Sequence, residues 1–287
     1  MQGLITAVIL GIIQGLTEFL PISSTAHLTL AGKFMGLIDP LHPEHWTATI
    51  AVIQLGTLIA VFVYFVKDII EILKSFFLDF FMRMKGNHAG ITDLNAKMGW
   101  MIVVGTLPVA ILGLAFRKVI EGTLTKNLYV IAGSMITLAV ILWLAEIVGK
   151  RTKEMQQLGF LDAIVIGIAQ SFALIPGASR SGSTITGGLF MGLKRETAAK
   201  FSFLLSLPAV LASGLLELKE SVKEIPDSPI GTVQLIVATI SAAIVGYLSI
   251  WFLLAYLKKH STGIFIGYRI FLGLLIIILL SAKIITT

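Results

Sequence analysis

Long apolar stretches alternate with shorter polar ones along most of the chain, which is the pattern of helices that cross a lipid bilayer. Such a helix needs about 20 predominantly apolar residues, and six stretches are long enough. They lie near residues 48–66, 98–116, 128–148, 199–218, 232–256 and 264–284. Polar segments separate most of them, the longest being 67–97. The pattern predicts six membrane-spanning helices.

Two further apolar stretches, 4–17 and 163–175, are too short to cross a bilayer, and a proline soon follows each. A helix of about 14 residues covers about 21 Å, against about 30 Å of hydrocarbon. A chain that stops there must turn back or line a cavity, because its free backbone groups cannot face lipid. The chain becomes apolar again after each break. We therefore expect two re-entrant helix–loop–helix hairpins, 4–37 and 160–193, with a kinked spanning helix as the alternative.

The two hairpins align with each other at a constant offset of 156 residues. Matching positions include Gly11 and Gly167, Gln14 and Gln170, Ser23 and Ser179, and the Phe-Met-Gly-Leu of 34–37 and 190–193. Each half then holds one hairpin and three spans, with repeat 1 over 1–148 and repeat 2 over 149–287. Because three spans end on the opposite side, the second half enters the membrane inverted. The expected fold is one all-α integral membrane domain with an inverted-topology repeat, whose broken segments usually carry the site.

The composition supports a membrane protein and excludes several kinds of site. Hydrophobic residues make up 56% of the 287 residues and charged residues 13%, against about 25% charged in soluble domains. The absence of cysteine excludes disulfides, thiolate zinc sites, iron–sulfur clusters and cysteine nucleophiles. The net charge of +6 first indicates cytoplasmic loops, so we expect no nucleic-acid partner.

The distribution of basic residues predicts the orientation. The side of the N-terminus carries seven: Lys33, Arg117, Lys118, Lys126, Lys219, Lys223 and Lys283. The opposite side carries thirteen: Lys67, Lys74, Arg83, Lys85, Lys97, Lys150, Arg151, Lys153, Lys194, Arg195, Lys200, Lys258 and Lys259. The positive-inside rule then places both termini outside the cytoplasm. Arg269, near the start of the last apolar stretch, is interpreted as a residue that snorkels to the cytoplasmic side.

The first break brings several reactive side chains together. Gln14 and Glu18 are four residues apart and share a helix face, and a carboxylate in an apolar segment is a functional hypothesis by default. Beyond the break follow three hydroxyl residues and a histidine: Ser23, Ser24, Thr25 and His27. Serine, imidazole and carboxylate are the parts of an activated nucleophile. Taken singly, the hydroxyl residues could instead cap the returning helix.

The second break has the composition of an anion site. Arg180 lies in an apolar hairpin, where a guanidinium needs an anionic partner. Small and hydroxyl residues surround it, among them Ser179, Ser181 and Thr184, and a helix begins just beyond. Helix N-terminus, hydroxyl donors and guanidinium together favour a bound phosphate. The alternative is a buried ion pair with Glu18, and both can hold if the pair opens for substrate.

At these residues the sequence resembles the bacterial undecaprenyl-pyrophosphate phosphatase family of the bacitracin-resistance type. The segment 14–27 matches the family motif Glu/Gln-Gly-x-x-Glu-Phe-Leu-Pro-x-Ser-Ser-Thr-x-His, and 176–185 matches Pro-Gly-x-Ser-Arg-Ser-Gly-x-Thr-Ile. The stretch 191–205 is also similar to the family. Gln14 stands where some members have glutamate, so only Glu18 can supply a carboxylate from that helix.

The resemblance implies a phosphatase of the bacterial cytoplasmic membrane whose site opens to the outer face. It would hydrolyse undecaprenyl diphosphate to the monophosphate carrier lipid used in peptidoglycan synthesis. Mg²⁺ or Ca²⁺ would support activity, and Glu18, with Gln14, would hold this ion or orient the base. The partners expected are a polyprenyl diphosphate lipid and the bilayer, and the oligomeric state stays open, a homo-oligomer included.

The roles of the site residues follow from this chemistry and the resemblance together. Ser24 attacks the terminal phosphorus, or His27 does so directly, and the sequence leaves both open. Arg180 stabilises the charge that develops on the phosphate. The expected substrate-binding residues are Gln14, Ser23, Thr25, Ser179, Ser181 and Thr184. A polyprenyl-phosphate flippase or transporter is the alternative function, because broken helices in inverted repeats are common in transporters.

Overall fold

The computed structural model describes residues 2–39, 41–86, 93–116, 127–221 and 230–285. Regular structure in these ranges is helical, apart from one β-bridge between Lys153 and Leu193. The α-helices are α1 (Gln2–Phe19), α2 (Ser24–Phe34), α3 (Pro43–Tyr64), α4 (Val66–Met84), α5 (Leu94–Ala115), α7 (Leu128–Val148), α8 (Phe160–Ser171), α9 (Arg180–Phe190), α10 (Arg195–Ser221), α11 (Thr232–Leu257) and α12 (Gly263–Ser281). Two 3₁₀ turns, η2 (Met155–Gln157) and η3 (Phe172–Leu174), flank α8.

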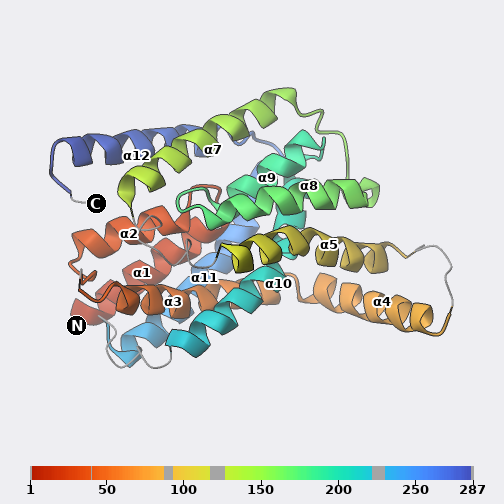
Figure 1. Ribbon diagram of the computed structural model, residues 1–287, viewed down its shortest axis with the longest axis horizontal. Coiled ribbons are helices and arrows are strands. Elements are labelled where there is room, and N and C mark those ends of the chain that lie inside the picture. The colour runs from red at the N-terminus through yellow and green to blue at the C-terminus, as the bar shows by residue number, and fades with distance from the viewer. Residues whose placement is uncertain (1, 40, 87–92, 117–126, 222–229, 286–287) are drawn as a thin grey trace.

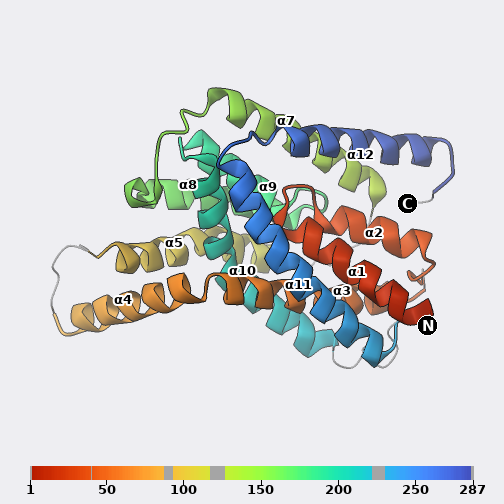
Figure 2. The ribbon, with the colours of Figure 1, turned by 180° about the vertical axis from the view of Figure 1, so that it is seen from behind.

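The six predicted spans are confirmed by length and composition. Within the described residues, α3, α5, α7, α10, α11 and α12 contain apolar segments of 19 to 26 residues that could cross a membrane. The chain is therefore a multi-pass membrane protein built from helices. The ribbon shows α3, α5 and α12 lying roughly along the long axis of the molecule, whereas α10 and α11 run obliquely to it (Figures 1 and 2).

Helix α4 is a feature that the hydrophobic pattern did not predict. It occupies most of the polar segment expected at 67–97 and follows α3 after a single non-helical residue, Phe65. Asp79 accepts hydrogen bonds from Arg83 at 2.6 Å and from Trp100 of α5 at 2.8 Å, and these bonds hold the pKa of the carboxyl below its usual range. Helices α4 and α5 lie side by side and extend beyond the rest of the protein at one end (Figures 1 and 2).

The two expected hairpins appear as helix–break–helix pairs with matching local geometry. Ser23 caps α2 and Ser179 caps α9, each accepting a hydrogen bond from the backbone N–H three residues later. Both serines have a positive φ, 76° and 67°, and Gly36 and Gly192 just after the two returning helices do as well. These pairs keep the offset of 156 found in the sequence. Re-entry into the bilayer, inversion of the second half and the boundary between 148 and 149 stay predictions.

Close packing of helices through glycine brings the parts of the bundle together. A Cβ atom on Gly11 of α1 would lie 2.4 Å from the carbonyl oxygen of Ala238 in α11. One on Gly167 of α8 would lie 2.2 Å from the carbonyl oxygen of Gly105 in α5. Helices in membranes associate mainly by such close contact of small residues, since lipid gives no hydrophobic driving force between them. The backbone of each broken pair is thereby fixed against a spanning helix.

Both termini lie at one end of the molecule, opposite the tip of α4 and α5 (Figures 1 and 2). Near the other ends of α7, α10 and α12, Glu146 accepts hydrogen bonds from Arg151, Arg195 and Thr262. This is the end predicted to be cytoplasmic from its basic residues. Four of the seven basic residues counted for the side of the N-terminus lie outside the described ranges: Arg117, Lys118, Lys126 and Lys223.

Candidate active site

Glu18, near the end of α1, is the centre where the two breaks meet. Its Oε1 accepts a hydrogen bond from Nη2 of Arg180 at 2.7 Å, and its Oε2 accepts one from the Ser24 hydroxyl at 2.7 Å. Both charged side chains are largely buried, with 7% of the Glu18 side chain and 16% of the Arg180 side chain exposed. The ion pair considered from the sequence is therefore present, and it joins residues 162 positions apart.

Arg180 has a second hydrogen-bonding group that this pair does not use. Its Nη1 atom is buried and has no partner within the described residues. As the first residue of α9, Arg180 lies where the backbone N–H groups of a helix favour an anion. A guanidinium can donate two parallel bonds to one phosphate. The arrangement therefore suits a bound anion, which would either share the Arg180 guanidinium with Glu18 or replace Glu18 as its partner.

Gln14 lies one turn before Glu18 and is 1% exposed. Its Nε2 donates to Glu18 at 3.2 Å and to Thr57 of α3 at 3.4 Å. Its carbonyl oxygen Oε1 is buried and has no partner among the described residues. An orphaned amide oxygen beside a carboxylate is the kind of ligand that Mg²⁺ and Ca²⁺ accept. The described residues contain no cluster of three or more acidic, histidine or cysteine side chains, so a cation here would need further ligands from phosphate and water.

His27 lies in α2 but is bonded away from Ser24. Its Nδ1 is 2.7 Å from the carbonyl oxygen of Ser23, and its Nε2 is 2.6 Å from the hydroxyl of Tyr268 in α12. The Ser24 hydroxyl instead donates to Glu18. The serine and the carboxylate predicted from the first break are brought together, whereas the histidine is held by another helix.

The remaining expected hydroxyl residues differ in their surroundings. Ser23 and Ser179 cap α2 and α9, and Thr25 is exposed. Ser181 lies 3.2 Å from the Ser179 hydroxyl and donates to the Leu20 carbonyl oxygen, which links the second break to the first.

Thr184 is fully buried in the first turns of α9. Its hydroxyl lies within hydrogen-bond distance of the Arg180 and Ser181 carbonyl oxygens and of the Ser202 hydroxyl in α10. In this structure Thr184 therefore supports the helix that begins at Arg180.

Arg269 does not snorkel, and the interpretation from the sequence was wrong. The residue is 0% exposed, and its Nη2 donates to the carbonyl oxygens of Gly177 and Ala178 at 3.3 and 2.8 Å. The guanidinium lies beside the second break because α12 packs along α7, and α7 itself contacts that break. The hydroxyl of Ser134 in α7 donates to the carbonyl oxygen of Pro176, next to Gly177. One signal for such a role was present in the sequence, a cation inside an apolar stretch, but snorkelling explained it equally well.

A small cavity of about 10 Å³ adjoins Arg180. It is lined by Phe19, Thr57, Leu58, Val61, Arg180, Ser206, Leu207 and Val210. The guanidinium thus borders apolar side chains of α3 and α10, in a space that holds no more than about one water molecule.

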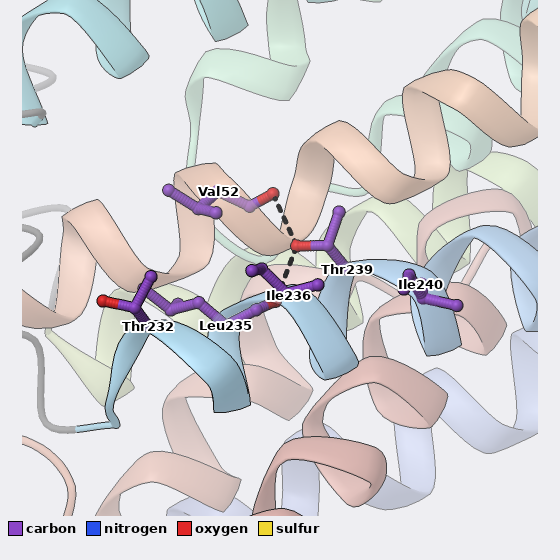
Figure 3. A pocket seen from close by; sticks show the side chains of 6 residues that line it. All are labelled: Val52, Thr232, Leu235, Ile236, Thr239 and Ile240. Atoms are coloured by element: carbon purple, nitrogen blue, oxygen red, sulfur yellow. Dashed lines mark hydrogen bonds between the residues drawn. The ribbon is translucent and has the colours of Figure 1, made fainter.

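A larger groove of about 260 Å³ lies between α3 and α11 (Figure 3). Its lining is mostly aliphatic, and the hydroxyl of Thr239 is within hydrogen-bond distance of the carbonyl oxygens of Val52 and Leu235. Ile236 and Ile240 in this lining are each 55% exposed. Since it offers no ionisable group, we assign the chemistry to the site around Glu18 and regard the groove as part of the lipid-facing surface.

Comparison with known proteins gives matches over nearly the whole chain. Residues 7–275 match the family described as bacitracin resistance protein BacA. An undecaprenyl-diphosphatase of Syntrophobacter fumaroxidans is 54% identical over 274 residues, which cover 95% of this chain and 94% of the relative. An undecaprenyl-diphosphatase of Chlorobaculum tepidum is 52% identical over 287 aligned positions, with 98% of each chain covered.

Proposed function

The chain belongs to the bacitracin resistance protein family, and we propose that it hydrolyses undecaprenyl diphosphate to undecaprenyl phosphate and inorganic phosphate. The relatives named undecaprenyl-diphosphatase align with it from end to end. The observation that carries the proposal is the contact of Glu18 with both Ser24 and Arg180. A nucleophile, a base and a phosphate-binding cation meet there at one point. The flippase alternative has no comparable support.

Binding of the diphosphate requires an exchange of partners at the ion pair. Arg180 would turn its two terminal nitrogens to the terminal phosphate, and the N–H groups at the start of α9 would bind the same group. Glu18 then loses its ion pair with Arg180 but keeps the hydrogen bond from Ser24. The apolar side chains of Leu58, Leu207 and Val210 line the small space beside Arg180. They would have to move apart to contact the first isoprene unit, which is covalently attached to the inner phosphate.

In the chemical step, the Ser24 oxygen would attack the terminal phosphorus while its proton passes to Oε2 of Glu18. The bond from phosphorus to the bridging oxygen breaks, and undecaprenyl phosphate leaves. Water then attacks the phosphoserine and the bond from phosphorus to the Ser24 oxygen breaks. Glu18 returns its proton to that oxygen, which regenerates the Ser24 hydroxyl, and the inorganic phosphate keeps both protons of the water. Arg180 stabilises the charge on the phosphate oxygens in both steps. We favour Ser24 over His27 because the serine is the one bonded to a base.

A divalent cation fits this site as a further component. Glu18 and the free carbonyl oxygen of Gln14 would hold it, together with phosphate oxygens, as is usual for Mg²⁺. When bound, such an ion neutralises charge on the phosphate.

The proposed location is the bacterial cytoplasmic membrane, with the site open to the outer face. The six spans make the protein integral to a membrane. The smaller number of basic residues at the end with the termini supports an outward position for that end. Release of product on that face would return the carrier lipid for peptidoglycan synthesis.

The test is phosphate release by the purified protein in detergent. We expect turnover of C55 diphosphate, its loss in Ser24→Ala, and a decrease on addition of EDTA that Mg²⁺ or Ca²⁺ reverses. A protein that only transports lipid would release no phosphate, and that result would refute the proposed function. Activity unaffected by EDTA would refute only the proposed role of a divalent cation and leave the proposed hydrolysis standing.

A further inference from the structure

Two consecutive residues of α12 contact both breaks. Tyr268 bonds to His27, which follows the first break, and Arg269 bonds to the carbonyl groups of the second. Helix α12 is the last span and contributes no residue to the proposed chemical step. It packs against α7, and its buried side chains Ile276 and Leu280 form one apolar cluster with Ala26 of α2.

Contacts with Ser23 and Tyr268 hold both ring nitrogens of His27. The Ser23 carbonyl oxygen can only accept, so Nδ1 of the neutral ring carries the hydrogen and donates it. Nε2 then accepts the hydrogen bond from the Tyr268 hydroxyl. The two rings are also stacked, with centroids 5.6 Å apart and an angle of 7° between their planes. The Ser23 carbonyl thus determines the tautomer of His27, and Tyr268 holds the orientation of the ring through its hydroxyl and its stacked ring.

Arg269 holds the turn that precedes Arg180. Its hydrogen bonds fix the peptide groups of Gly177 and Ala178, immediately before Ser179 caps α9. Two of its nitrogens, Nε and Nη1, are buried without a partner in the described part of the chain. Nη1 lies close to the first turn of α9, because a Cβ atom on Gly182 would be only 2.6 Å from it. A displaced guanidinium would therefore shift the backbone that presents Arg180.

We propose that Tyr268 and Arg269 are positioning residues, which hold His27 and the turn before Arg180 in register across the two breaks. The inference rests on the proposed function, since it concerns the geometry of the same site. Neither residue needs to touch substrate. Displacement of a binding group by about 1 Å can lower a rate about 100-fold, so small shifts of this turn are sufficient to affect turnover.

Arg269→Lys keeps the charge but cannot reproduce the bonds of a planar guanidinium. Gly182→Ala leaves Arg269 in the sequence but displaces its guanidinium with the added Cβ atom. Gly267→Ala on α12 is the matched control, because a Cβ atom there has nothing within 4 Å. We expect kcat to fall about 100-fold in the first two variants, with KM changed much less, and wild-type kinetics in the control. A kcat within twofold of wild type in either folded variant would overturn the role of Arg269.

Tyr268→Phe keeps the stacked ring and removes the hydroxyl, which frees Nε2 of His27. Modification of His27 by diethyl pyrocarbonate, followed by peptide mass analysis, should become about two- to tenfold faster, as expected for loss of one hydrogen bond. Unchanged modification would overturn the role of Tyr268. This measurement does not depend on turnover. If the wild-type protein releases no phosphate while the labelling difference persists, the proposed function fails and the contact stands.

Discussion

Replacement of Arg180 by lysine separates the two tasks of its guanidinium. Nη2 neutralises Glu18, whereas the unpartnered Nη1 is available for a phosphate oxygen. An ammonium can perform the first task but cannot make two parallel bonds to one phosphate. We therefore expect Arg180→Lys to melt near the wild-type temperature while its kcat falls about 10²–10³-fold, which corresponds to about 2.7–4 kcal/mol.

Arg180→Ala should lose the same activity and also stability. Removing one partner of a buried ion pair costs about 3–5 kcal/mol, because the other charge stays buried without compensation. Here 7% of the Glu18 side chain and 16% of the Arg180 side chain are exposed, so we expect about 3 kcal/mol, at the lower end of that range. Arg180→Ala combined with Glu18→Gln should recover most of the stability and none of the activity.

The assay measures phosphate release from C55 diphosphate, with kcat and KM determined separately, beside thermal melting in the same detergent. Arg83→Lys is the matched control, since this arginine pairs with Asp79 on α4, outside the site. A wild-type kcat in Arg180→Lys would show that Arg180 only neutralises Glu18, and the phosphate-binding role would be refuted.

Three further predictions test the nucleophile, the second break and the orientation. Ser24→Ala should reduce turnover at least about 100-fold without loss of folding, and substantial residual phosphate release would exclude the serine as nucleophile. Gly177→Ala should destabilise the protein by about 2–5 kcal/mol in detergent melting, because the φ of Gly177 is +86° and the added Cβ meets neighbouring backbone. Gly133→Ala is the control, because a Cβ atom there has open space, and it should not change the melting temperature. Equal melting of the two variants would contradict this account. As the chain has no cysteine, single cysteines at the exposed residues Leu41 and Lys85 report the topology in spheroplasts: an impermeant thiol reagent should label the first and spare the second, and the reverse pattern would invert the orientation.

The spanning helices could be predicted from the sequence because membrane insertion depends on local hydrophobicity over about 20 residues. Helix α4 could not be predicted in this way, since charges at Lys67, Asp68, Glu71 and Lys74 interrupt its apolar residues. Its stability depends on packing against α5, through the contacts of Asp79 and Phe76 with Trp100, which no local pattern encodes.

The contacts in the site could be predicted from the sequence where the interacting residues lie in the same motif or where a residue clearly requires a partner of opposite charge. Glu18 and Ser24 lie in one motif, and the isolated Arg180 required an anion, so their meeting could be anticipated. Whether His27 or Glu18 accepts the Ser24 proton depends on side-chain directions after the break, which sequence spacing does not determine. The role of Arg269 depends on carbonyl groups 91 and 92 residues away.

The positive φ values of Ser23 and Ser179 have a consequence for how the site would receive a substrate. Each such conformation of a residue with a side chain costs about 1–3 kcal/mol and persists only where the surroundings enforce it. Glycine would relieve the strain but would remove the hydroxyl that caps the following helix. Folding thus stores conformational energy at both turns in advance. The backbone of both turns is therefore already in place before a ligand binds, and the rearrangement that the proposed substrate requires is confined to the side chains of Glu18 and Arg180.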